Sequence, residues 1–360
     1  MPIRLIDADT VPPVRSQTVY HAVAYAMTPE TPNTIILVAP DAPYVCIGFH
    51  QEVDKEVNVD FCREHGLPVV RREVGGGAVY LDSNQVFTQW VFHEEDLPMQ
   101  VEKRFRLHAE PLVKTYRALD IPAEFHPVND VQVRGRKIGG MGAAAIGNAE
   151  VLVCSLMFDF NFELMARVLK VPDEKFRNKI YQSLQEYMTT LTRELGAAPG
   201  KEMVKELYIR ECQTLFDDEL IPGEFTDPEL REMEKLDAKF SSRSWLDEKG
   251  GLVRPAVKIH ADVWVGETAY KAPGGLIRAT VRIRKNRIDD ISFSGDFTLY
   301  PQDQLRVLEQ ILLHQPIENE ALMDAARKFY EENDVQSPGI EPEDWVNAIA
   351  DLGASVLRSG

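Results

Sequence analysis

Residues 75–77 are three consecutive glycines, and two arginines, Arg71 and Arg72, stand just before them. Glycine has no Cβ atom, so the backbone amides of such a segment can approach a phosphate or carboxylate closely. A guanidinium group beside them adds charge-assisted hydrogen bonds to the same anion. Because side chains alternate along a strand, only one arginine can face the ligand. We expect this to be Arg72, with Arg71 in a surface salt bridge; the triplet alone fits a tight hairpin turn equally well.

Lys137 is the second candidate, within GRKIGG at residues 135–140. Small residues continue to Asn148, which would let a reacting ligand lie against the backbone. A lysine at this place can hold an α-phosphate and stabilise the charge that develops as an acyl adenylate forms and as AMP leaves. The alternative is a solvated lysine in a basic turn, which is commoner for any single lysine.

Asn129 and Asp130 precede Lys137 on the same predicted strand. Their amide and carboxylate suit recognition of a base, or contact with Mg²⁺ or a lysine amine, and one carboxylate suffices for magnesium that is also held by substrate phosphates. The alternative is a turn or cap pair. Neither the P-loop pattern nor the dinucleotide-binding pattern fits the glycine triplet.

The hydrophobic pattern predicts the elements that position these residues. The triplet lies in a strand-loop-strand context, and a small-residue loop at 139–148 separates the two strands around Lys137. The expected strands are 34–39, 44–48, 68–72, 78–80, 86–92, 129–138 and 150–160, and the expected helices are 16–27, 61–65, 102–119, 172–195 and 201–216.

A stretch rich in proline and aspartate, residues 221–250, precedes a new block of strands. We therefore expect two domains, a catalytic domain at 1–247 and a smaller one at 248–360. In the second we expect strands at 256–264, 276–284 and 288–294, followed by helices at 301–313, 318–331 and 342–352.

Composition excludes several classes of protein. With 57 acidic and 40 basic residues, the net charge of −17 argues against broad binding to nucleic acid. The four cysteines have no metal-ligand spacing, which favours reduced thiols. The N-terminal segment lacks the apolar core of a secretory signal, and no apolar run reaches the roughly 18 residues of a membrane span. We expect a cytoplasmic protein that does not contact membranes.

Together these segments carry a family resemblance. The ordered series RREVGGGAVYLD (71–82), ND (129–130) and GRKIGG (135–140) resembles lipoate–protein ligases, within the group of biotin and lipoate ligases and octanoyl transferases. The resemblance covers about residues 15–250 and is supported by GFHQ, VLKVPDEKF and FSSRSW, at residues 48–51, 168–176 and 240–245. KAPGGLI (271–277) and ISFSGDF (291–297) resemble the family's C-terminal accessory domain.

The resemblance implies an α/β (α+β) fold, with a biotin ligase-like mixed sheet flanked by helices and a smaller α/β C-terminal domain. It implies ATP-dependent conversion of lipoate to lipoyl-AMP, with Mg²⁺, and transfer to a lysine of a lipoyl carrier protein by a monomeric enzyme. By resemblance Lys137 is catalytic and Asp130 the Mg²⁺ ligand. The implied substrate and adenylate contacts are Arg72, Gly75, Gly76, Gly77, Ala78, Asn129, Asp130, Lys137, Ile138, Gly139 and Gly140.

Some positions depart from the family pattern. Leu81 stands where a histidine is frequent, and Cys154 lies where a His-Gly pair usually follows. One alternative is therefore an octanoyl or lipoyl transferase that carries the acyl group on a cysteine and needs no ATP. Cys154 lies within an apolar strand, however, so we expect it to be packed in the core. The second alternative is a non-catalytic protein that binds lipoyl carriers.

Overall fold

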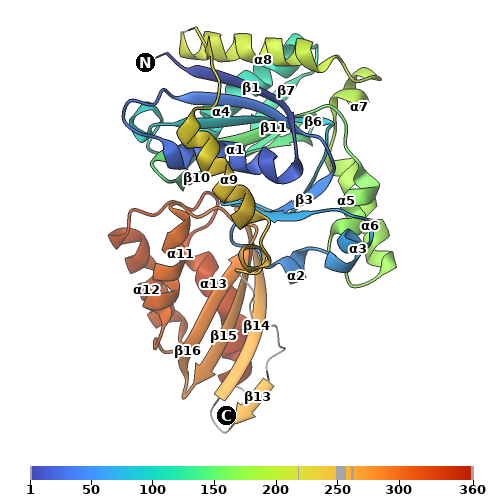
Figure 1. The fold of residues 1–360 in the computed structure, drawn as a ribbon. Helices are drawn as coiled ribbons and strands as arrows, with labels where there is room; N and C mark the ends of the chain where they lie inside the picture. Colours follow the sequence, from blue (N-terminus) through green and yellow to red (C-terminus); the bar gives the residue numbers. More distant parts are fainter. Residues whose placement is uncertain (1, 218, 249–256, 261–262, 358–360) are drawn as a thin grey trace. The chain divides into compact units, whose positions relative to one another are not determined.

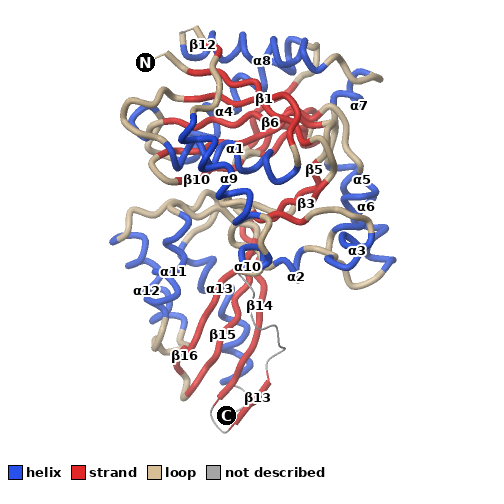
Figure 2. Tube along the Cα trace, viewed as in Figure 1, coloured by secondary structure: helices blue, strands red, loops and turns tan. Residues whose placement is uncertain are grey.

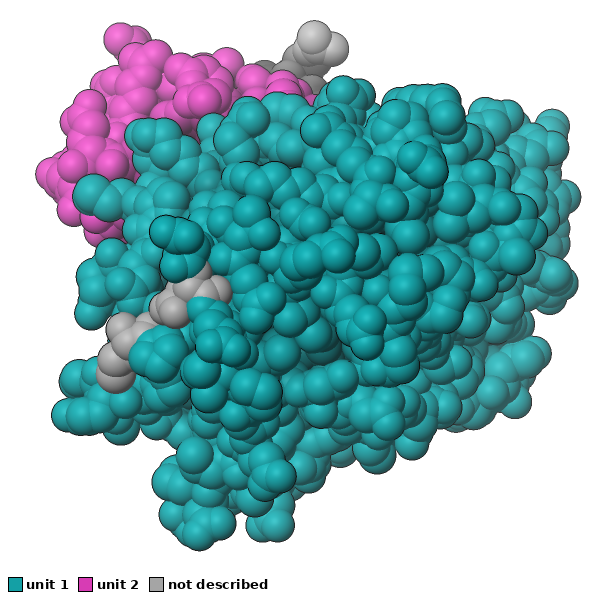
Figure 3. All heavy atoms as spheres, turned by 90° about the horizontal axis from the view of Figure 1, so that it is seen from above, with its two compact units in different colours: residues 1–47, 54–73, 78–246 teal, residues 48–53, 74–77, 247–360 magenta. Residues whose placement is uncertain are grey.

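The computed structural model describes residues 2–217, 219–248, 257–260 and 263–357. The chain divides into two compact units, coloured separately in Figure 3. Unit 1 comprises residues 1–47, 54–73 and 78–246; unit 2 comprises residues 48–53, 74–77 and 247–360. Two short segments of the N-terminal half, one of them containing the glycine triplet, thus belong to unit 2.

Unit 1 is built on a mixed six-stranded sheet of order β10-β11-β6-β2-β1-β12. Strand β1 pairs in parallel with both β2 and β12, and the remaining neighbours are antiparallel. Every residue of β2 and β6 is buried, as expected for central strands. The strands are β1 (Arg4–Val11), β2 (Thr34–Pro40), β6 (Gln85–Phe92), β10 (Gly142–Ile146), β11 (Ala149–Met157) and β12 (Ile221–Pro222).

Helices cover both faces of this sheet (Figure 1). Neighbouring residues of β6 show this, because Gln89 donates to the carbonyl of Ser16 in α1 and Trp90 donates to the hydroxyl of Tyr208 in α8. Helix α9 packs on α1, and α4 packs on α8. The predicted α/β class with a mixed sheet between helices is confirmed. The long helices are α1 (Pro13–Ala26), α4 (Val101–Ala118), α6 (Glu174–Tyr187), α8 (Lys201–Phe216) and α9 (Asp227–Phe240).

Two small sheets and several short helices complete unit 1. The sheets have the orders β4-β3-β5 and β7-β8-β9. Their strands are β3 (Tyr44–Ile47), β4 (Val69–Arg71), β5 (Val79–Leu81), β7 (Ala123–His126), β8 (Asp130–Val133) and β9 (Arg136–Gly140). The short helices, the first of which bridges the division between the units, are α2 (Val53–Glu56), α3 (Val59–Glu64), η1 (Glu94–Asp96), α5 (Phe162–Val168), α7 (Leu191–Leu195) and α10 (Arg243–Leu246).

Three predicted segments are wrong. The single strand expected at 129–138 is the hairpin of β8 and β9, because the chain turns at Arg134 and Gly135. Within the loop expected at 139–148, residues 139–140 end β9 and residues 142–146 form strand β10 (Figure 2), which pairs with β11 at the edge of the large sheet. Alanines and glycines are poor strand formers, but the pairing of residues 142–146 with β11 provides partners for the backbone of β10. The helix expected at 172–195 breaks into α6 and α7, because the amide of Thr189 donates to the carbonyl of Lys137 instead, and Thr190 caps α7.

Unit 2 has an antiparallel sheet of order β13-β14-β15-β16, with α11 and α13 packed against it and α12 packed on these two helices. The strands are β13 (Val257–His260), β14 (Val263–Ala272), β15 (Gly275–Arg284) and β16 (Arg287–Gly295). They confirm the strands predicted at 276–284 and 288–294, whereas residues 256 and 261–262 of the first predicted strand lie outside the described residues. The three predicted helices are also confirmed, as α11 (Leu305–Leu312), after η2 (Gln302–Gln304), α12 (Asn319–Glu332) and α13 (Pro342–Leu357). No described helix is both long and apolar enough to span a membrane.

Candidate functional site

Lys137 lies on β9, in the hairpin that β9 forms with β8. The hairpin turns through Arg134 and Gly135, both with positive φ. Asp130 at the start of β8 stands opposite Gly140, and the register shifts by one residue between that end and Lys137, at Ile138. Such a bulge re-aims the side chains that flank it. The hairpin therefore brings together most of the predicted site residues of unit 1.

The Lys137 ammonium forms an ion pair with Asp130, at 2.6 Å from Nζ to Oδ1. The lysine side chain folds back over Gly140 to reach it, since a Cβ atom on Gly140 would lie only 2.6 Å from Nζ and from Cε. The lysine side chain keeps 29% of its surface exposed. Lys137 is thus held at rest by one carboxylate and remains accessible to an incoming anion.

Tyr187, the last residue of α6, is a member of this group that the sequence did not indicate. Its hydroxyl donates to Oδ2 of Asp130 at 3.0 Å, so the carboxylate receives a different partner on each oxygen. Burial, and then the Asp130 charge, raises the pKa of Tyr187 to about 12. A bridge between Lys137 and Met188 fixes the end of α6 beside the lysine. A tyrosine at the end of an amphipathic helix carries no sequence signal for this role.

Asn129 connects the start of β8 to the segment that joins β9 and β10. Its side-chain amide donates to the carbonyl of Met141 at 2.6 Å, and its own carbonyl accepts from the Met141 amide at 2.8 Å. These bonds fix the strand that carries Asp130. The predicted contact of Asn129 with nucleotide stays a prediction.

Gly139 faces Cys154 across β9 and β11. A Cβ atom on Gly139 would lie 3.3 Å from the Cys154 sulfur. Cys154 is 6% exposed, and burial raises the pKa of its thiol to about 12. The predicted packing of Cys154 in the core is confirmed, and at neutral pH its sulfur is a protonated thiol.

The two arginines at the end of β4, Arg71 within the strand and Arg72 just after it, both donate to backbone carbonyls within unit 1. Arg71 was expected in a surface salt bridge, and this is wrong: it is 1% exposed and donates to the carbonyls of Trp245 and Leu246. Arg72 is half-buried and donates to the carbonyl of Cys46 at 3.3 Å. Arg71 therefore anchors the end of α10, and the predicted ligand contact of Arg72 stays a prediction.

The glycine triplet belongs to unit 2, where backbone packing explains its composition. The Gly76 amide donates to the carbonyl of Phe297 at 3.3 Å, and Gly76 has a φ of 91°. A Cβ atom on Gly75 would lie 2.8 Å from the same carbonyl oxygen. Gly77 lies beside Asp296. The predicted site residues thus divide between the units, with Gly75, Gly76 and Gly77 in unit 2 and Ala78 and the others in unit 1.

A magnesium site can be tested against the chemistry of the available ligands. Among the residues that the structure describes, no group of three or more His, Cys, Asp or Glu side chains could hold a metal ion. Asp130 alone offers a carboxylate beside Lys137, and such a carboxylate can hold Mg²⁺ when substrate phosphates provide further ligands. The residues therefore fit a magnesium ion that arrives with a nucleotide, rather than one that the protein holds by itself.

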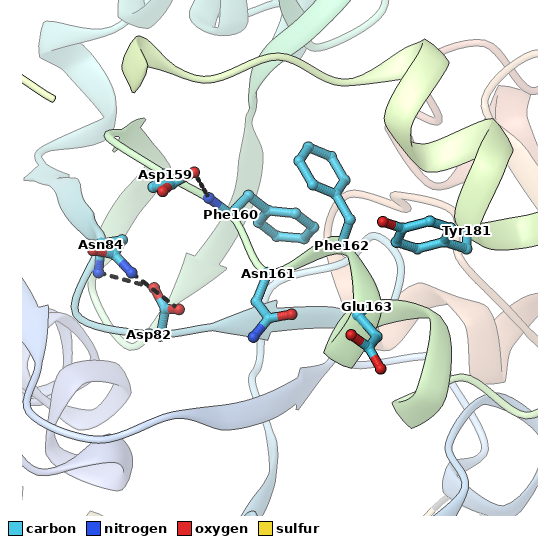
Figure 4. A pocket seen from close by; sticks show the side chains of 8 residues that line it. All are labelled: Asp82, Asn84, Asp159, Phe160, Asn161, Phe162, Glu163 and Tyr181. Carbon is cyan, nitrogen blue, oxygen red and sulfur yellow. Dashed lines mark hydrogen bonds between the residues drawn. The ribbon is translucent and has the colours of Figure 1, made fainter. Parts of the chain in front are cut away.

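A pocket with a volume of about 350 Å³ opens elsewhere in unit 1 (Figure 4). Its acidic residues are engaged locally: Asp82 accepts from the amide of Asn84, and Asp159 from that of Phe160. These bonds stabilise the loops that form the wall. None of the predicted site residues lines the pocket, which is formed by Asp82, Asn84, Asp159, Phe160, Asn161, Phe162, Glu163 and Tyr181.

Two family models match the chain. The model described as the lipoyl protein ligase A/B catalytic domain matches residues 15–213, and the model described as the bacterial lipoate protein ligase C-terminus matches residues 267–349. The first contains Lys137 and Asp130, and the second covers most of the sheet and helices of unit 2.

Curated relatives include both ligases and transferases. Lipoate–protein ligase 2 of Staphylococcus aureus is 26% identical over 80% of this chain and 83% of its own length. Octanoyltransferase LipM of Moorella thermoacetica is 24% identical over 68% of this chain and 98% of its own length. Among solved structures, the bi-partite lipoate protein ligase of Thermoplasma acidophilum, studied with its E2 lipoyl domain, has a TM-score of 0.63 and 26% identity over 72% of this chain and 100% of that one.

Proposed function

Because this chain belongs to the lipoyl protein ligase A/B family and is an enzyme of its ligase and transferase group, we propose that it is an ATP-dependent lipoate–protein ligase. It activates lipoate as lipoyl-AMP, releases pyrophosphate and transfers the lipoyl group to a lysine of a carrier protein. The observation that carries this proposal is the second match, to a lipoate protein ligase C-terminus at 267–349, on a folded unit of the same chain. The octanoyltransferase of Moorella thermoacetica aligns over nearly its whole length with only 68% of this chain.

In the activation step Lys137 exchanges one anion for another. The ion pair with Asp130 keeps the ammonium in place before substrate arrives. The α-phosphate of ATP competes for it with a higher charge, and the lysine then stabilises the negative charge that builds up as the lipoate carboxylate attacks phosphorus and pyrophosphate leaves. Magnesium, held by Asp130 and the phosphates, would offset the charge of the triphosphate.

In the transfer step the amine of the carrier lysine attacks the carbonyl carbon of lipoyl-AMP, and AMP leaves. The mixed anhydride is already activated, so the protein needs no nucleophile of its own. Lys137 stabilises the departing phosphate, while Arg72, Ala78, Ile138 and Gly139 form part of the proposed acyl and adenylate contacts. Asp130 is the carboxylate nearest to this lysine on the hairpin and can hold the incoming amine.

A transferase mechanism would need a reactive thiol that carries the acyl group as a thioester. Cys154 does not suit that role, because its sulfur is buried against Gly139 and its pKa is raised to about 12. A catalytic cysteine is instead accessible and has a lowered pKa. These properties favour the ligase over the transferase.

The proposed partner is a lipoyl carrier protein, either a lipoyl domain or a glycine-cleavage H-like protein. The lipoyl domain is supported by the ligase from Thermoplasma acidophilum, which was studied with its E2 lipoyl domain. A basic surface at Arg134 and Arg136 would be a weak docking site, because both side chains pair with Glu194. The described cysteines form no disulfide, which favours the proposed cytoplasmic location. We also propose that the enzyme acts as a monomer.

The test is pyrophosphate release from ATP, Mg²⁺ and lipoate in the absence of a carrier. A ligase releases pyrophosphate, whereas a transferase or a non-catalytic binding protein releases none. Parallel reactions with octanoate and biotin measure which acid the pocket prefers. Addition of a lipoyl domain should then give a lipoylated lysine that is visible as a mass increase.

A further inference from the structure

Asp130 is held by two side chains that come from different parts of unit 1. Lys137 from β9 forms an ion pair with Oδ1, and Tyr187 from the end of α6 donates a hydrogen bond to Oδ2. The carboxylate itself is 13% exposed. A carboxylate that is largely removed from water depends on such partners, and each partner weakens its attraction for the other.

The contact of Tyr187 is not a by-product of core packing. No residue of α6 is buried, and the Tyr187 side chain is 49% exposed. The end of this helix is attached to Lys137 through the backbone bridge at Met188 and the bond from the Thr189 amide to the Lys137 carbonyl. The Arg193 side chain also donates to the carbonyls of Gln185 and Met188 at this end. The helix therefore presents its last tyrosine to the one carboxylate that pairs with the candidate catalytic lysine.

We propose that Tyr187 is a positioning residue that sets how tightly Asp130 holds Lys137, and hence how readily the lysine moves to the phosphate of ATP. Its hydroxyl offsets part of the carboxylate charge before ATP arrives. When Lys137 leaves, the same hydrogen bond keeps the carboxylate in place. The expected effect of Tyr187 on the KM for ATP rests on the proposed ligase function. The effect of Tyr187 on the ion pair between Asp130 and Lys137 does not depend on that function.

Tyr187→Phe removes the hydroxyl and keeps the ring. Asp130 then keeps only the ion pair with Lys137 of these two contacts, so the lysine is held more tightly and is less available to ATP. We expect the KM for ATP in pyrophosphate release to rise about three- to tenfold, as for the loss of one charge-assisted hydrogen bond at a half-exposed site. The KM for lipoate, kcat and the thermal midpoint should stay close to those of the unchanged protein. Loss of helix packing would instead lower the thermal midpoint and affect both substrates.

Tyr181→Phe is the matched control, because Tyr181 lies on the same helix and its hydroxyl accepts from Gln185 of that helix instead of contacting Asp130. It should leave the KM for ATP unchanged. An equal rise in both variants would overturn the proposal, since it would reflect a general effect on α6.

Chemical labelling tests the same contact without any enzymatic activity. Without ATP and Mg²⁺, acetic anhydride should acetylate Lys137 about threefold more slowly in Tyr187→Phe than in Tyr181→Phe or the unchanged protein, measured by peptide mass spectrometry. An unchanged or faster rate overturns the proposal. If the unchanged protein releases no pyrophosphate, the ligase function fails, while the labelling rates still decide the role of Tyr187.

A double variant, Asp130→Asn with Tyr187→Phe, tests whether Tyr187 acts on Lys137 through Asp130. Asp130→Asn removes the charge that the hydroxyl offsets, so adding Tyr187→Phe to it should have no further effect on Lys137 labelling. Additive effects of the two substitutions would show that Tyr187 acts on the lysine by another route, and would overturn the proposal.

Discussion

The β8–β9 hairpin and the glycine triplet differ in what holds them. On the hairpin, side-chain charges place Lys137, because Asp130 and Tyr187 contact each other and the carboxylate contacts the lysine. At the triplet, main chain packs on main chain, as the bond from the Gly76 amide to the Phe297 carbonyl shows. The hairpin should therefore respond to changes of charge with a loss of rate, and the triplet to added atoms with a loss of stability.

The largest effect is expected from Lys137→Ala. Loss of the cation that stabilises charge at the reacting phosphate should slow pyrophosphate release about 10²- to 10³-fold. The thermal midpoint should change little, because the lysine is partly exposed and its pair with Asp130 is its main contact. Lys114→Ala, which removes an exposed lysine paired with Glu110, is the control and should leave the rate unchanged. If Lys137→Ala released pyrophosphate within twofold of the rate of the unchanged protein, the hairpin would have no part in the proposed mechanism.

Gly140→Ala tests the same hairpin without removing a charge. Its Cβ atom would lie 2.6 Å from Nζ and Cε of Lys137, so the lysine must leave its resting position. Displacement of a catalytic group by about 1 Å can cost about 10- to 100-fold in rate, and we expect a loss of this size in pyrophosphate release. Because the displaced atoms are the end of a flexible side chain, the protein should remain folded with an unchanged circular dichroism spectrum. An unfolded variant would mean that Gly140 is required for backbone packing, as the glycine triplet is.

Gly75→Ala should reveal the other kind of constraint. A methyl group there meets the Phe297 carbonyl oxygen at 2.8 Å, which is backbone that cannot rotate away. We expect a loss of about 1–3 kcal/mol in stability, typical of overpacking. Hydrogen exchange should be faster in the peptides that contain residues 74–77 and 296–298.

Gly200→Ala is the control for this substitution, because nothing lies within 4 Å of the added Cβ atom and φ is −63°. A Gly75→Ala protein that is as stable as this control but inactive would assign the triplet to ligand binding rather than packing.

The sequence predicted what is local and missed what depends on distant contacts. It selected Lys137 and Asp130 as candidates from their residue types, and short apolar runs between turn residues located most strands. The structure pairs the two side chains, and their proposed roles stay predictions. It misjudged residues 139–148, whose alanines and glycines form a strand only because β11 pairs with them. Tyr187 and Arg71 were missed or misplaced because their partners lie 57 residues and more than 170 residues away along the chain.

Cys154→Ser is expected to have the smallest effect, and it decides between the ligase and its rival. The sulfur is buried against Gly139, and the ligase mechanism needs no thiolate at this position. A hydroxyl in its place should cost about 1 kcal/mol in stability, because a polar group is then buried. Pyrophosphate release and transfer to a lipoyl domain should both stay within about twofold, since an adenylate needs no protein nucleophile. If transfer stopped while the protein remained folded, the acyl group would travel on Cys154, and the hairpin would be the site of a transferase.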